Sequence, residues 1–205
     1  MLGRTHSLTS GLQEPLRVPY DASDAAYKMA VGLDSVLREH AGKDVVIVCV
    51  GTDRSTGDAF GPIIGSRLSR VVTGEHVYIY GTLDTPVHAV NLGAKLEDIS
   101  YFHRSRPHIV IAIDACLGKF DHVGQIVLER GALRPGAGVK KELPEFGAYT
   151  ITGVVNVAGF MEYFVLQNTR LGIVMKMSDV VVHALSSSLR RFQDSHESVE
   201  VPGAQ

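Results

Sequence analysis

The sequence predicts a three-layer α/β/α domain built around a mostly parallel β-sheet. Two runs, residues 44–50 and 108–114, are apolar along their whole length, and a third strand-like run lies between them at 76–81. Strands with continuous rather than alternating apolarity are typical of parallel sheets that are covered on both faces. Helix-like segments at 61–70 and 87–104 separate the three runs, and this alternation with short connections indicates a doubly wound sheet.

Further elements are expected on either side of this central unit. A helix with a regular apolar stripe should follow Ser23, and residues 124–131 should form a strand, for which an antiparallel direction is one option. A further strand is expected at 148–155. Two amphipathic helices, at 156–170 and 174–192, should complete the domain.

The organisation expected from these elements is one domain with two short extensions. Residues 1–20 lack a clear period and contain Pro15 and Pro19, so we expect a flexible N-terminal arm. Residues 21–193 should form the single α/β/α domain. Residues 194–205 are polar and should be a frayed tail.

The composition argues against several classes of partner. The chain has 205 residues, of which 20 are basic and 22 acidic, so no overall positive field favours nucleic acid or an anionic membrane. No stretch approaches the roughly 20 apolar residues of a membrane helix, and the N-terminus lacks the apolar core of a signal peptide. We therefore expect a cytoplasmic protein. Cys49 and Cys116 form no CxxC pair, which predicts reduced thiols.

An unusually polar loop follows the first strand of the central unit. It reads GTDRSTGDAFG and carries Asp58 near its end, while Asp114 closes the run at 108–114. In an open parallel sheet, ligands bind outside the carboxyl ends of the strands, where the crossovers diverge. If the first and third strands are neighbours, as is common in such folds, Asp58 and Asp114 face one crevice.

Paired carboxylates have several possible roles. Each disfavours ionisation of the other, so the pair can share a proton, activate water and protonate a leaving group. The same pair could bind a divalent metal, with His88 as a third ligand. In the plain structural interpretation, Asp58 caps a helix and Asp114 closes a turn.

The remaining candidates are substrate-binding residues. Thr52, Asp53 and Ser55 stand in the loop with Asp58. A second loop, PGAGVKKEL at residues 135–143, has glycines that permit close approach of a ligand to the backbone. Lys141 and Glu142 of that loop could bind a carboxylate or a peptide end, although an ordinary solvated loop would look the same.

The motifs GTDRSTGDAFGP, TLDTPVHAVNL, IAIDACLG and PGAGVKKELP, in this order, resemble the YyaC family of sporulation proteins over roughly residues 25–192. At greater distance the chain is similar to the spore germination protease. The D-A-x-G-P and I-D-A segments of that enzyme match the sequence around Asp58 and Asp114. The resemblance implies the phosphorylase/hydrolase-like, three-layer fold of hydrogenase-maturation peptidases, in which acidic residues and a His bind the nickel of a partner protein.

The resemblance leads to one main hypothesis and two alternatives. The main hypothesis is a sporulation-associated, peptidase-like hydrolase that uses Asp58 and Asp114 on a spore protein or peptide. One alternative is a binding or regulatory module of sporulation that keeps the fold without catalysis. The other is a metal-dependent, maturation-type endopeptidase with Asp58, Asp114 and His88 around a divalent metal. A homo-oligomer is possible in each case.

Overall fold

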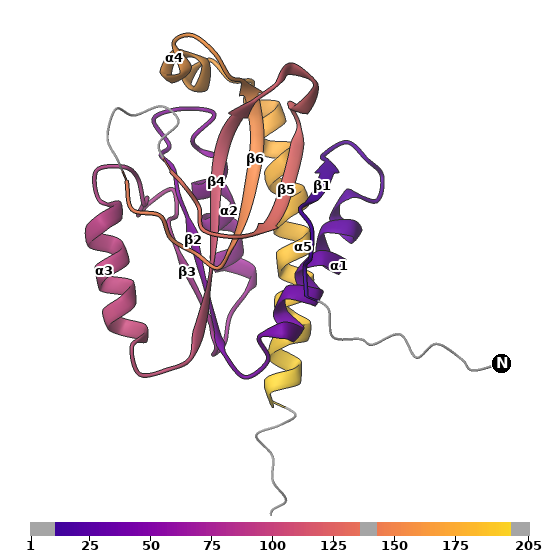
Figure 1. The fold of residues 1–205 in the computed structure, drawn as a ribbon, viewed down its shortest axis with the longest axis vertical. Helices are drawn as coiled ribbons and strands as arrows, with labels where there is room; N and C mark the ends of the chain where they lie inside the picture. Colours follow the sequence, from indigo (N-terminus) through magenta and orange to yellow (C-terminus); the bar gives the residue numbers. More distant parts are fainter. Residues whose placement is uncertain (1–10, 136–142, 198–205) are drawn as a thin grey trace, which may run out of the picture.

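The computed structural model describes residues 11–135 and 143–197 and is built around a six-stranded sheet with the order β1-β5-β6-β4-β2-β3 (Figure 1). The strands comprise β1 (Leu16–Pro19), β2 (Asp44–Cys49), β3 (Val77–Tyr80), β4 (His108–Gly118), β5 (Gln125–Arg130) and β6 (Tyr149–Val157). The four strands β3, β2, β4 and β6 are parallel, and β5 and β1 are antiparallel to their inner neighbours. The predicted mostly parallel sheet is confirmed, as is the antiparallel direction of the strand at 125–130.

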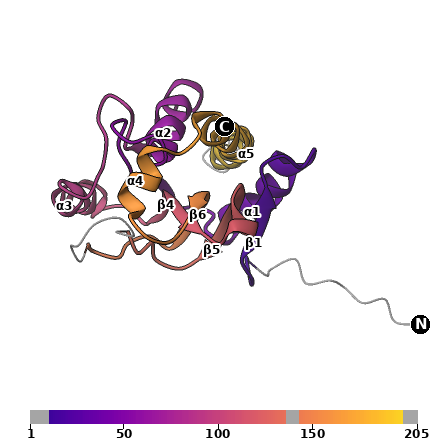
Figure 2. The same cartoon turned by 90° about the horizontal axis from the view of Figure 1, so that it is seen from above.

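Helices cover both faces of the sheet. They comprise α1 (Ala25–Glu39), α2 (Phe60–Val71), α3 (Leu92–His103), α4 (Glu162–Gln167) and α5 (Leu171–Glu197). Seen from above, α1, α2 and α5 lie on one side of the sheet and α3 on the other (Figure 2). The short helix α4 stands over the end of the sheet where the parallel strands finish (Figure 1). Within the described ranges, no helix has both the length and the apolar character needed to cross a membrane.

The continuous apolarity of β2 results from this double cover. Val45 and Ile47 belong to the large core beneath α1, α2 and α5, whereas Val46 and Val48 belong to the smaller core beneath α3. Successive side chains of a strand point to opposite faces, so every residue of a strand covered on both faces is buried. All six residues of β2 are buried accordingly.

Regular structure extends beyond both boundaries of the predicted domain, within residues 11–135 and 143–197. Residues Leu16–Pro19 of the predicted flexible arm form β1, which pairs with β5 and places Val18 in the core. Proline is tolerated there because β1 is an edge strand, where one row of backbone groups needs no partner. At the other end, α5 continues to Glu197, four residues into the predicted frayed tail.

The predicted helix at 156–170 is wrong for most of its length. Residues 156 and 157 extend β6, which keeps pairing with Leu117 and Gly118 of β4. The chain then turns through Gly159 and through Met161, which has a positive φ of 59°. A left-handed residue interrupts a right-handed helix, so only the six residues of α4 are helical.

Gly51 connects β2 to the polar loop under a tight steric constraint. Its φ is +141°, and a Cβ atom there would lie 1.9 Å from the carbonyl oxygen of Asp58. The loop returns at this point, because the N–H of Thr52 donates to that same carbonyl at 3.2 Å. The return of the loop therefore requires glycine for space as well as for backbone conformation.

We predict that Gly51→Ala lowers the free energy of unfolding by more than about 3 kcal/mol, because backbone strain and a backbone clash add together. Gly131→Ala is the matched control, with a φ of +136° and no atom within 4 Å of the added Cβ. It should cost only about 1 kcal/mol. Urea unfolding measures both values. Equal losses of unfolding free energy would show that the clash with the Asp58 carbonyl adds nothing to the backbone strain.

Candidate active site

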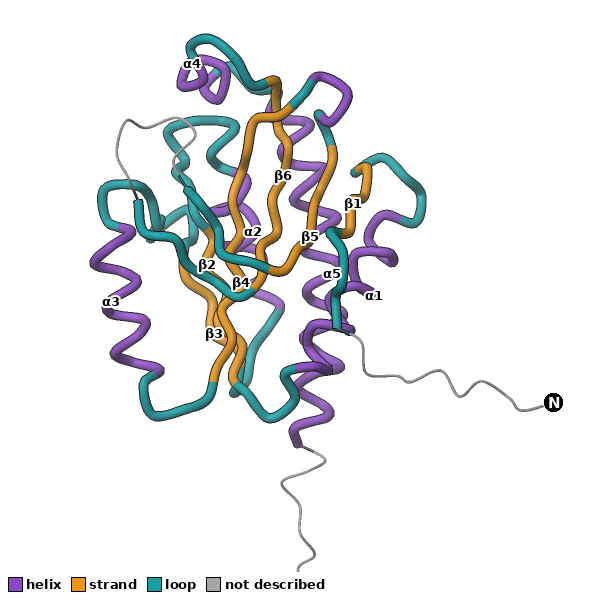
Figure 3. The backbone as a smooth tube through the Cα atoms, in the orientation of Figure 1, coloured by secondary structure: helices purple, strands orange, loops and turns teal. Residues whose placement is uncertain are grey.

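A crevice opens beside Asp114 because β4 is longer than β2. The two strands pair up to Cys49 and Ile113, and the N–H of Val50 then donates to the Ile113 carbonyl at 2.7 Å. Beyond that bond β2 turns away, while β4 continues for five more residues alongside β6 (Figure 3). Asp114 is therefore not the last residue of its strand, as predicted, but the first to lose its neighbour on the β2 side.

Asp58 reaches the same crevice from the loop between β2 and α2. Backbone bonds hold the loop in place, since the N–H of Gly51 donates to Val87 O at 2.8 Å and that of Ala59 to Ser55 O at 3.0 Å. Ala59 is the residue at the N-cap of α2, and no side chain caps the helix. The structural interpretation of Asp58 as a helix cap is therefore wrong, and its carboxyl is directed to the cavity.

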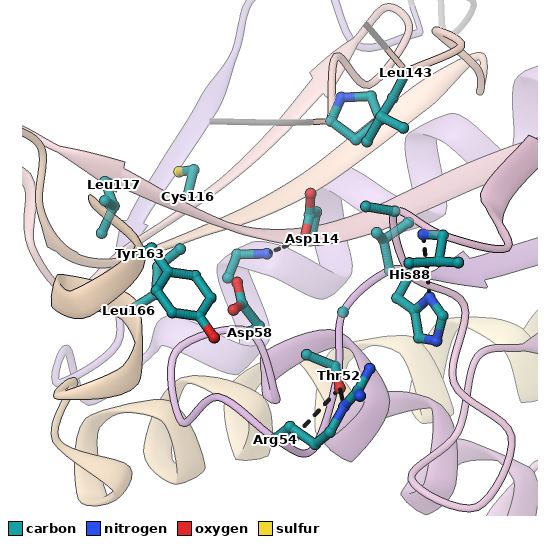
Figure 4. A pocket seen from close by; sticks show the side chains of 16 residues that line it. Thr52, Arg54, Asp58, His88, Asp114, Cys116, Leu117, Leu143, Tyr163 and Leu166 are labelled. Carbon is teal, nitrogen blue, oxygen red and sulfur yellow. Dashed lines mark hydrogen bonds between the residues drawn. The ribbon is translucent and has the colours of Figure 1, made fainter. Parts of the chain in front are cut away.

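Both carboxyl groups line one cavity of about 310 Å³ (Figure 4). Polar side chains form part of its wall and come from three segments of the chain: Thr52, Arg54, Asp58, His88, Asp114 and Cys116. Most of the remaining wall is apolar, with Leu117, Leu143 and Leu166 among its residues. The predicted convergence of the two aspartates at the carboxyl ends of β2 and β4 is thus observed.

The environment of Asp114 favours its protonated form. Burial raises the pKa of Asp114 well above its ordinary value of 3.8, a hydrogen bond from the Ala115 N–H opposes the rise, and the charge of Asp58 adds to it. The N–H of Ala115 donates to Asp114 Oδ1 at 2.8 Å. Burial and a nearby like charge both disfavour a second carboxylate.

Asp58 is the member of the pair that ionises first. Burial also raises the pKa of Asp58, and the hydroxyl of Ser55 opposes this rise. Ser55 Oγ has no partner at full hydrogen-bond geometry, so we attribute its influence to the proximity of its dipole. Burial raises the pKa of Asp114 well above its ordinary value and the charge of Asp58 raises it further, so Asp114 is the carboxyl group of the pair that keeps its proton to higher pH.

Cys116 contributes a thiol rather than a thiolate to the cavity. Burial, reinforced by the charge of Asp114, raises the pKa of Cys116 to about 11. The thiolate is the nucleophilic form of cysteine, and a depressed pKa is the usual mark of a catalytic one. Cys116 therefore lacks the lowered pKa that is typical of a catalytic cysteine.

The other predicted substrate-binding residues are separated by the structure. Thr52 lines the cavity, whereas Asp53 is exposed outside it and Ser55 is buried and does not line it. Lys141 and Glu142 lie outside the described residues. Pro135 and Leu143, on either side of that gap, both line the cavity.

The geometry does not assemble the predicted metal site. Among residues 11–135 and 143–197, no three His, Cys, Asp or Glu side chains are placed to hold a metal ion. His88 lines the cavity, but its Nδ1 accepts a hydrogen bond from the Val90 N–H at 3.3 Å. A neutral imidazole that accepts at Nδ1 carries its proton on Nε2, so His88 presents a donor there rather than a metal-binding lone pair.

Several residues of the wall were not predicted, among them Arg54, Tyr163 and Leu166. Arg54 stands in the polar loop, where its positive charge between two carboxylates was the available signal. Tyr163 and Leu166 come from α4, and no local pattern links that helix to the loop after β2. A backbone hydrogen bond connects α4 to the loop, because the N–H of Gly57 donates to the carbonyl of Leu166 at 2.9 Å.

We predict that Asp114→Asn weakens the pH dependence of folding stability. A raised folded-state pKa means that the folded protein holds more protons than the unfolded chain above pH 3.8, so stability falls as pH rises through this window. The variant keeps the acceptor for Ala115 but cannot ionise, and at pH 7 it should be at least as stable as the wild type. Urea unfolding between pH 4 and 8 tests this, with exposed Asp53→Asn as the control that retains the decline. The assignment would be contradicted if the stability of the wild type rose with pH while that of Asp114→Asn did not.

Alkylation tests the state of Cys116. A thiol of pKa about 11 is roughly one part in a thousand ionised at pH 8, against about a quarter for a free cysteine. Iodoacetamide should therefore label Cys116 about 100-fold more slowly in the folded protein than in the urea-unfolded chain, as followed by mass spectrometry of the tryptic peptide. Equal rates in the two states would place a thiolate in the cavity.

Three comparisons place the chain among known proteins. A family described as "Protein of unknown function (DUF1256)" matches residues 17–184. A Bacillus subtilis (strain 168) protein, "Uncharacterized protein YyaC", is 52% identical over 170 residues, covering 82% of this chain and 81% of that one. The crystal structure of a [NiFe] hydrogenase maturation protease, HycI from Thermococcus kodakarensis KOD1, aligns with a TM-score of 0.54 at 17% identity, over 76% of this chain and 98% of that one. The fold is thus of the hydrogenase-maturation-protease type, and the chain, a relative of YyaC, belongs to the DUF1256 family.

Proposed function

We propose that this protein is a peptidase-like hydrolase in which Asp58 and Asp114 act together on a peptide bond. The observation that carries the proposal is the pair itself: two carboxyl groups line one cavity, and the charge of one raises the pKa of the other. In many active sites, the catalytic acid and base are two titratable groups whose environments push their pKa values apart.

The difference in pKa between the two carboxyl groups decides which of them acts as the base and which as the acid. Asp58, as carboxylate, accepts a proton from a water molecule while the water oxygen attacks the carbonyl carbon of the substrate. Asp114, as carboxylic acid, donates its proton to the amide nitrogen as the carbon–nitrogen bond breaks. The products are a carboxylic acid and an amine, and the pair again holds one proton. No metal is needed to balance these steps.

The surroundings of the cavity suit a polypeptide better than a small polar metabolite. Much of its wall is apolar, and beside it α4 exposes Tyr163 and Phe164 while the turn before α4 exposes Phe160, which is 89% exposed. Exposed apolar groups clustered next to a cavity are typical of surfaces that bind other proteins. We infer that the substrate is a protein or peptide, and the family resemblance suggests one of spores or sporulating cells.

The same exposed surface also fits the alternative of a non-catalytic binding module. Such a module would bind its partner through α4 and leave it intact. The two functions differ in their products, because hydrolysis creates new amino termini whereas binding leaves an unprocessed complex.

Cleavage can be tested without knowing the natural substrate. Purified protein is incubated with a peptide library prepared from sporulating Bacillus subtilis, and new amino termini are identified by isotopic labelling and mass spectrometry. We predict that Asp58→Asn and Asp114→Asn each reduce cleavage by a factor of about 10²–10⁴, the usual contribution of a general acid or base. Their melting temperatures should stay near that of the wild type.

Asp53→Asn and Asp84→Asn are matched controls, since neither of these aspartates lines the cavity. Both should cleave like the wild type. Cleavage that survives in Asp58→Asn or Asp114→Asn would remove the proposed mechanism. A stable complex with intact peptides, and no new termini with any variant, would establish the binding module instead.

A further inference from the structure

Two hydrogen-bond donors enter the cavity on neighbouring loops. Arg54 belongs to the loop after β2 and His88 to the loop after β3, and both line the cavity. The loops are joined by the bridge between Val50 and Val87 and by the bond from the Gly51 N–H to Val87 O. Thr52 follows Gly51 and His88 follows Val87, so the two loops begin next to each other at this hydrogen bond.

Arg54 is held in position but is not neutralised. Its Nε donates to Thr52 Oγ1 at 3.4 Å, and its backbone N–H donates to the same oxygen at 3.3 Å (Figure 4). Among the described residues it forms no ion pair within 4 Å. It also does not figure among the charges that shift the pKa of Asp58 or Asp114. The positive charge of Arg54 is thus free to bind an anion.

His88 adds an uncharged donor with a fixed orientation. Its backbone N–H donates to Asn91 Oδ1 at 2.8 Å, and its ring accepts from the Val90 N–H at Nδ1. Asn91 is anchored in turn, because its Nδ2 donates to the Pro86 carbonyl at 2.9 Å. The ring proton consequently lies on Nε2, which forms no hydrogen bond with another described residue.

We propose that Arg54 and His88 form a binding subsite for a carboxylate group of the ligand. A guanidinium is the side chain best suited to a carboxylate, and a neutral imidazole N–H supplements it without adding charge. The subsite deepens the proposed hydrolase and rests on it for the identity of the ligand as a peptide. The binding chemistry itself does not depend on cleavage.

The apolar wall narrows the class of ligand. Ala89 and Val90 follow His88 directly in the chain, and both line the cavity. A carboxylate bound at Arg54 would therefore have an apolar side chain beside it. This carboxylate can be the terminal carboxylate of an apolar residue or the side chain of an acidic residue next to one.

Binding of small probes separates these two sources and is independent of turnover. The probes are N-acetyl-leucine, N-acetyl-leucinamide, N-acetyl-aspartyl-leucinamide and N-acetyl-asparaginyl-leucinamide, titrated by NMR against the wild-type protein. We expect at least one acid to bind about tenfold or more tightly than its amide, in line with hydrogen bonds to charged groups. The acid that shows this preference identifies the source of the carboxylate.

Variants assign the preference to the subsite. Arg54→Gln should abolish the preference for acid over amide, and Arg104→Gln, an exposed arginine on the far end of α3, should leave it unchanged. His88→Gln keeps a donor and should retain more affinity than His88→Ala, while ¹⁵N spectra of the wild type should show the proton on Nε2. Equal binding of acids and amides, or a preference that survives Arg54→Gln, overturns the proposal, whether or not the protein cleaves peptides. If the wild-type protein cleaves no peptide but binds the acids more tightly than the amides, the hydrolase proposal is rejected and the subsite proposal stands.

Discussion

The charge of Asp58 acting on the carboxyl group of Asp114 is the interaction on which the account of this site depends. Two carboxyl groups in a partly apolar cavity cannot both ionise at low cost, because little water remains to screen them. Burial makes the difference between them, since it raises the pKa of Asp114 well above its ordinary value while Asp58 is partly relieved by Ser55. The result is one acid and one base within the same cavity.

The fold produces this arrangement through a difference in strand length. Because β4 continues past the end of β2, Asp114 faces an opening that is a general ligand-binding position in parallel sheets. The tight return of the loop at Gly51 brings Asp58 back to the same opening. The neighbouring loop, joined at Val87, adds His88 to the wall, so three strand ends supply the polar groups of one cavity.

The sequence was sufficient for the parallel core and for the aspartate pair, because both follow from local signals. Continuous apolar runs identified β2 and β4, and the position of polar residues at their ends identified the crevice. The role of β1 could not be predicted, since four residues with a proline carry no pattern until β5 is beside them. The contribution of α4 could not be predicted for a similar reason. Its position depends on a backbone hydrogen bond between Gly57 and Leu166, which are far apart in the sequence. His88 was correctly placed near the site, but its tautomer depends on Val90 and could not be read from residue types.

The most direct test is the titration of Asp114 by carboxyl ¹³C NMR, in the wild type and in Asp58→Asn. In the wild type, Asp114 should titrate well above its ordinary pKa of 3.8. In Asp58→Asn its pKa should fall, because the neighbouring charge is gone, yet stay raised by burial. A pKa of Asp114 that is ordinary in the wild type, or unchanged by the loss of the Asp58 charge, would contradict the account.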